Sequence, residues 1–222
     1  MKNLYTIILL TLLSLLMPSL AAAQSFQNVS IADASTVYSI AQDEQGIMWF
    51  GTDHGLYAYD GYRSIPHNTD TDGTPVITRV HSICIFKDML YMATERGLMA
   101  YDIRRGRYAE RTSGGMGEMR AVTIYGGRLW YGGAQGLFSR DLQTGTKRTE
   151  NSRLHNVYSL LPTRHGLLVG TLTGLTVLRN GKAQPIRIGE GSQPLVNARA
   201  QRGTIPGDAQ AQHVVARVLL RG

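Results

Sequence analysis

The chain has 222 residues, of which 18% are charged and 43% hydrophobic, with a formal net charge of +7 at pH 7. Lys2 and the segment after Asn197 carry four of these net charges, which leaves about +3 elsewhere and no basic stripe. The balance therefore excludes a nucleic-acid binder of the usual strongly basic kind. A single cysteine, Cys84, excludes an intramolecular disulfide framework, and we expect it to be a buried, unreactive thiol.

Residues 1–23 are typical of a secretory signal peptide. Lys2 precedes an apolar run from Leu4 to Met17, and small residues follow up to Ala23. Cleavage is expected between Ala23 and Gln24, which would place the mature chain in the periplasm. The run has about 14 residues, fewer than the 18 or so of a membrane span, and an uncleaved anchor is the alternative.

Residues 24–36 are expected to form an N-terminal strand and an entry loop, and a repeated unit occupies residues 37–197. Units begin near residues 37, 80, 119, 157 and 196. Their register is marked by Gly-Leu pairs at intervals of 42, 39 and 38 residues, which start at Gly55, Gly97, Gly136 and Gly174. A period of about 40 residues is typical of propeller blades and of some helical solenoids.

The first unit predicts four short strands. Strands are expected at residues 37–42, 47–51, 56–59 and 62–65, because turn residues separate these apolar segments. Asp60-Gly61 predicts a type I′ hairpin turn, and Arg105-Gly106, Thr144-Gly145 and Asn180-Gly181 hold the same position later. A helical repeat is disfavoured because Gly, Asp or Asn interrupts each unit every five to seven residues. Four strands per unit indicate a propeller blade.

One large apolar position recurs in the second strand of each unit. We expect its side chains to fill the core between neighbouring blades rather than to form ligand platforms. The residues at this position are Trp49, Tyr91, Trp130 and Leu168.

Residues 37–61 closely resemble the two-component regulator propeller repeat. The shared pattern runs from Val37-Tyr-Ser-Ile through Trp49-Phe-Gly51-Thr and Gly55-Leu to Tyr59-Asp-Gly61. The resemblance extends over residues 26 to about 197 and weakens in later units, where Gly-Thr becomes Ala93-Thr94 and Gly132-Gly133.

The resemblance implies an all-β, partial β-propeller of four four-stranded blades plus the start of a fifth, preceded by the signal peptide. Members of the family are periplasmic sensor regions of hybrid histidine kinases, and many of them sense oligosaccharides. It implies an oligosaccharide ligand, no cofactor, no kinase activity in this chain, and a membrane connection only through segments further downstream. The alternatives are a stand-alone periplasmic binding or scaffold propeller, and a propeller lyase.

Residues 198–222 depart from the repeat. A fifth unit begins near Leu195, but Arg199 then occupies a position that is apolar in the other units. The sequence predicts a frameshifted or truncated tail, and the alternative is a closing strand at Val214–Leu220. Because an open array exposes a strand edge, we expect self-association or a homodimer.

Catalytic and metal-binding patterns are weak. Asn68–Gly73 imitates the start of a calcium loop, but Arg79 stands where the bidentate Glu is required, so a solvated loop is favoured. Histidines lack metal-ligand spacing, and no nucleophile elbow or kinase motif occurs. Four residues in or near loops are candidate ligand contacts, with solvated loop positions as the alternative: Tyr62, Arg63, His67 and Tyr108.

Overall fold

The computed structural model describes residues 31, 34–110, 117–151 and 154–186, together with the backbone of two strands at 199–202 and 214–217. All of them belong to one compact unit, Ile31–Gly222. The predicted signal peptide with its Ala23–Gln24 cleavage site, most of the entry segment 24–36 and the start of a fifth unit lie outside the described residues. Within the described ranges, no helix could cross a membrane.

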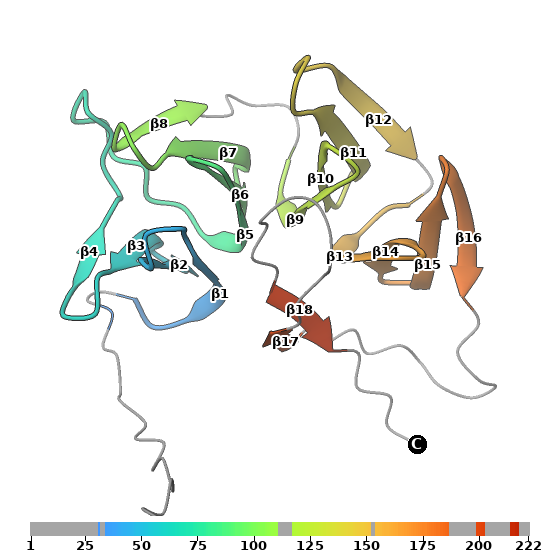
Figure 1. The fold of residues 1–222 in the computed structure, drawn as a ribbon, viewed down its shortest axis with the longest axis horizontal. Coiled ribbons are helices and arrows are strands. Elements are labelled where there is room, and N and C mark those ends of the chain that lie inside the picture. The colour runs from blue at the N-terminus through green and yellow to red at the C-terminus, as the bar shows by residue number, and fades with distance from the viewer. Residues whose placement is uncertain are drawn as a thin grey trace, which may run out of the picture. The chain divides into compact units, whose positions relative to one another are not determined.

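Four four-stranded antiparallel sheets and one two-stranded sheet form the described structure, and no helix occurs among the described residues (Figure 1). In every sheet the strands pair in chain order. The first sheet consists of β1 (Val37–Gln42), β2 (Met48–Thr52), β3 (Gly55–Tyr59) and β4 (Ser64–Pro66). The second consists of β5 (Val80–Phe86), β6 (Met89–Thr94), β7 (Gly97–Asp102) and β8 (Arg107–Glu110).

The third and fourth sheets repeat this arrangement. The third consists of β9 (Met119–Tyr125), β10 (Arg128–Gly133), β11 (Gly136–Asp141) and β12 (Lys147–Asn151). The fourth consists of β13 (Val157–Thr163), β14 (Gly166–Thr171), β15 (Gly174–Arg179) and β16 (Lys182–Ile186). The all-β fold of four four-stranded blades is therefore confirmed.

The Gly-Leu pairs mark the first residue of each third strand. Gly55, Gly97, Gly136 and Gly174 have φ angles of +118°, +115°, +137° and +139°, which residues with a Cβ rarely adopt. The preceding turn is closed by a threonine, since the Thr52 hydroxyl donates to the Gly55 carbonyl and accepts from the His54 amide. Thr94 repeats both bonds in the second sheet. This local chemistry explains why the pairs recur.

The predicted type I′ turn at Asp60-Gly61 is wrong. A type I′ turn requires positive φ at both central residues. Gly61 has φ +97°, but Asp60 does not have a positive φ. Instead, Asp60 Oδ1 accepts from the amides of Tyr62 and Arg63, and these bonds lower the pKa of the carboxyl. Both residues of Asn180-Gly181 do have positive φ, +50° and +74°.

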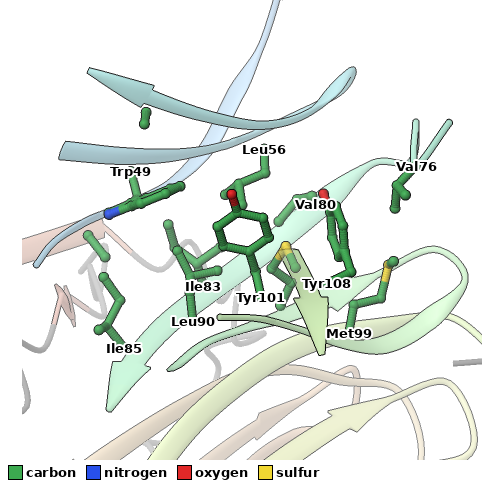
Figure 2. Close-up of a cluster of buried hydrophobic side chains, with 13 residues drawn as sticks. Trp49, Leu56, Val76, Val80, Ile83, Ile85, Leu90, Met99, Tyr101 and Tyr108 are labelled. Atoms are coloured by element: carbon green, nitrogen blue, oxygen red, sulfur yellow. The ribbon is translucent and has the colours of Figure 1, made fainter. Parts of the chain in front are cut away.

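Neighbouring sheets pack through apolar side chains. Trp49, Tyr91 and Trp130 are buried in the three successive seams, whereas Leu168 is half-buried. Figure 2 shows the first seam, where Trp49 and Leu56 face Ile83, Leu90 and Tyr101 of the second sheet. Cys84 is buried in the second seam, and this burial raises its thiol pKa far above the ordinary value.

The first strands of consecutive sheets also contact one another: β1 contacts β5, β5 contacts β9, and β9 contacts β13. In the tail, β17 (Arg199–Arg202) and β18 (Val214–Arg217) pair with each other as a two-stranded sheet. Among the described strands neither of them pairs with one of the four-stranded sheets, and the closing strand at Val214–Leu220 stays a prediction.

Candidate functional site

Every first strand contains a β-bulge at its second residue. In β1, Val37 pairs with Thr52 and Ser39 pairs with Gly51, so Tyr38 is an extra residue without an opposite partner. The same irregularity occurs in the other three sheets and leaves one extra residue in each. Bulges of this kind re-aim a side chain and are frequent beside functional sites. The four bulge residues are Tyr38, His81, Arg120 and Tyr158.

Close packing around the bulges fixes their position. Val80 and Val157, each the residue before a bulge, are fully buried. A Cβ on Gly51 would lie 2.8 Å from Val80 Cγ1, and one on Gly132 would lie 2.7 Å from Val157 Cβ. Glycine in the second strand of one sheet thus makes room for the first strand of the next. The bulge side chains therefore extend from a rigid frame.

The bulge side chains form a continuous row across all four sheets. The Tyr38 and His81 ring centroids are 5.6 Å apart, and His81 Nε2 lies 3.1 Å from Glu118 Oε1. Arg120 donates to both oxygens of Glu118, at 3.1 and 3.0 Å. The Arg120 guanidinium lies 4.5 Å from the centroid of the Tyr158 ring. These five residues, Tyr38, His81, Glu118, Arg120 and Tyr158, are named the bulge row below.

The bulge row combines exposed rings with partly buried polar groups. Tyr38 and Tyr158 are 45% and 40% exposed, although Val157, directly before Tyr158, is fully buried. The His81 side chain is only 16% exposed, and its Nε2 has no partner of good hydrogen-bond geometry among the described residues. Because the Nε2 atom is buried and lies against Glu118, the surface open to a ligand is formed by the two tyrosine rings.

Electrostatics keep the row nearly neutral. The hydrogen bonds from Arg120 hold the Glu118 pKa below its usual value, and Glu118 in turn raises the pKa of Arg120. Burial lowers the pKa of His81 even though Glu118 opposes this shift. At neutral pH the row therefore contains a neutral imidazole beside a closed ion pair.

A hollow of about 280 Å³ beside Trp49 is the other candidate site. Its polar groups already have internal partners, since Trp49 Nε1 donates to Asp43 at 2.8 Å and His67 Nδ1 lies 2.7 Å from Tyr101 Oη. The hollow therefore offers an apolar surface with little capacity for polar recognition. Its lining residues are Asp43, Gln45, Ile47, Trp49, Ala58, Asp60, Ile65, His67 and Ile103.

The candidate ligand contacts proposed from the sequence are not brought together. Tyr62 is 94% exposed and Arg63 is also exposed. His67 and Tyr108 are instead scaffold residues, since the Tyr108 hydroxyl donates to the His67 carbonyl at 2.6 Å and Tyr108 is buried. The solvated loop predicted at Asn68–Gly73 is wrong at Asp70, which is buried and accepts from the Thr71 and Tyr108 amides.

Sequence reasoning missed the bulge row. The available signal was the second residue of each unit, which is aromatic or polar although it follows an apolar Val or Met. Alternation along a strand places this residue on the opposite face from its neighbours, but it does not reveal that one residue is extra.

Comparison with known proteins identifies the repeat. The family model for the two component regulator propeller matches residues 32–54. The extracellular domain of BT4673 from B. thetaiotaomicron, described as a one component system, is 30% identical with a TM-score of 0.66, over 76% of this chain and 24% of that chain. A second structure of BT4673, described as a hybrid two component system, is 27% identical with a TM-score of 0.67, over 87% and 30%.

The extracellular domain of BT3049 from the same organism, also described as a hybrid two component system, shares the fold. It is 21% identical with a TM-score of 0.62, over 76% of this chain and 27% of that chain. This chain thus spans less than a third of these solved domains. No protein with curated annotation matches the sequence.

The matched repeat, the four sheets and the similarity to extracellular sensor domains agree with one another. They confirm the family that residues 37–61 indicate. The chain carries the two-component regulator propeller repeat, and it is homologous to the extracellular sensor domains of hybrid two-component systems.

Proposed function

We propose that this chain is the extracytoplasmic ligand-sensing propeller of a hybrid two-component system, and that its ligand is an oligosaccharide. The bulge row carries the proposal, because it presents groups from all four sheets on one connected surface. Loops and irregular positions held by a rigid scaffold are where binding residues concentrate.

The chemistry of the row suits a sugar chain. Tyr38 and Tyr158 supply two partly exposed rings, each with an apolar face and a polar hydroxyl. Between them, His81, Glu118 and Arg120 supply donors and acceptors for hydroxyl groups. Because the row extends over four sheets, it matches several linked sugar units better than a single monosaccharide.

Signalling would follow from a difference in affinity between two arrangements of the complete sensor. A ligand shifts such an equilibrium only when it binds one arrangement more tightly. Because the bulge row joins all four sheets, a bound ligand would favour the arrangement in which the sheets keep this spacing. Kinase domains of a longer protein would then supply the output.

The test is isothermal titration calorimetry of the purified chain against a panel of oligosaccharides and their component monosaccharides. We expect saturable binding of at least one oligosaccharide and weaker binding of its monosaccharide. Tyr158→Ala should weaken this binding, and the exposed Tyr62→Ala should not. The absence of binding across the panel would overturn the proposed ligand class.

The same samples distinguish a sensor from a lyase. After prolonged incubation, chromatography should recover the oligosaccharide unchanged. Recovery of cleaved products, lost in a His81→Gln variant, would contradict a purely sensory role.

A further inference from the structure

The charges of the bulge row are internally compensated. Both oxygens of Glu118 accept hydrogen bonds from Arg120, through Nε and Nη2. The other charged groups that act most strongly on His81 are Arg79, which is exposed, and Glu95. Two guanidinium groups are thus balanced by two carboxylates, and His81 adds no charge at neutral pH.

The pairing of Arg120 with Glu118 neutralises its charge and occupies two of its five N–H donors. A guanidinium binds a carboxylate best through two parallel N–H donors, and Glu118 already occupies two of them. The Arg120 guanidinium is also covered on one side by the Tyr158 ring. A ligand carboxylate beside Arg120 would also lie beside Glu118, a charge of the same sign.

We infer that the bulge row binds neutral oligosaccharides in preference to uronates, and that Glu118 sets this preference by occupying Arg120. The inference rests on the proposed function and specifies the ligand class of the same site. Tyr38 and Tyr158 then supply stacking surfaces, and the closed ion pair supplies hydrogen bonds to hydroxyl groups without a net charge.

The experiment compares two ligands that differ only in charge. One is a neutral oligosaccharide that binds in the panel, and the other is the uronate made from it by oxidation of its primary alcohols. In calorimetry of the wild-type chain, the dissociation constant of the neutral form should be about tenfold lower than that of the uronate.

Three variants connect the preference to the ion pair. Glu118→Gln should raise uronate affinity by about tenfold, since it frees the Arg120 guanidinium, and this gain should weaken with added salt. The double variant E118Q/R120Q should lose the gain. Glu110→Gln is the matched control, because Glu110 is likewise held by Arg140 and Lys147 but lies outside the row. Thermal melts establish that each variant is folded.

The outcomes separate the two claims. Tighter binding of the uronate by the wild-type chain, or an unchanged ratio in folded Glu118→Gln, overturns the inference and leaves the sensing function in place. A gain in uronate affinity that persists in E118Q/R120Q overturns the role of Arg120. A chain that binds neither form overturns the proposed ligand class itself.

Discussion

Two partly buried histidines, His67 in the first seam and His81 in the bulge row, show how scaffold and site differ in this molecule. Burial lowers the pKa of both. His67 lies 2.7 Å from the Tyr101 hydroxyl and packs against Trp49 with ring centroids 5.0 Å apart. His81 Nε2 lies 3.1 Å from Glu118 Oε1, and the ring lies beside the half-exposed Tyr38. Residue type and pKa direction are the same in both cases, so the exposure of the neighbouring residues distinguishes the site from the scaffold.

The largest expected effect is on the scaffold. Trp49→Ala should lower the free energy of unfolding by about 3–5 kcal/mol, because it removes a buried indole and leaves a cavity between two sheets. Urea denaturation followed by circular dichroism measures the loss. Tyr62→Ala is the control and should stay within about 0.5 kcal/mol of wild type, since the side chain is 94% exposed. Similar losses in both variants would contradict the packing described for the first seam.

A smaller scaffold effect is expected from a single hydroxyl. Tyr108→Phe should cost about 1 kcal/mol, because the bond to the His67 carbonyl is lost at a buried position. Tyr59→Phe is a matched control, since Tyr59 also donates to a backbone carbonyl, that of Gly61, but in an exposed setting. Neither variant should change ligand affinity. A fall in affinity for Tyr108→Phe would place His67 and Tyr108 in the site after all.

In the bulge row, a substitution should change ligand affinity more than it changes stability. Tyr158→Ala should cost less than about 1 kcal/mol of stability, the usual range for an exposed cation–π contact. Oligosaccharide affinity should nevertheless fall about tenfold, as measured by calorimetry. If stability falls sharply while affinity is retained, the row is part of the scaffold and not a binding surface.

The smallest expected effect is on pH dependence. The folded-state pKa of His67 is lowered, so below the unfolded-state value of about 6.5 the unfolded chain binds more protons. Stability therefore falls as pH decreases below about 6.5 and levels off below the folded-state pKa. His67→Gln should flatten this slope, because it removes the ring whose pKa is lowered by burial. Equal slopes for wild type and His67→Gln in urea titrations would contradict a neutral, buried ring.

The repeated blade could be predicted from the sequence because its signals are local. Gly55 and its counterparts mark a backbone conformation, and the Thr52 turn is closed within four residues. The Asp60 turn was mispredicted because a side chain, not backbone geometry alone, satisfies the amides of Tyr62 and Arg63. Local sequence therefore specified the strands better than it specified the turn types.

The site could not be predicted in the same way because its contacts join residues from different units. His81 approaches Glu118 only when β5 lies against β9, and Arg120 reaches Tyr158 only when β9 lies against β13. Likewise, the burial of His67 and Tyr108 depends on a contact between residues 41 positions apart. Contacts between units, which no single unit encodes, decide which polar residues remain available to a ligand.

The bulges also separate the side chains proposed to bind ligand from the pairing of the strands. Each bulge residue has no opposite partner in its sheet, while Val80, Met119 and Val157 beside three of these residues provide the packing. Side chains at positions 38, 81, 120 and 158 can thus be exchanged in combination with little disturbance of the backbone pairing around them. Four interchangeable positions on one frame would allow proteins of this architecture to recognise different sugars through a few substitutions.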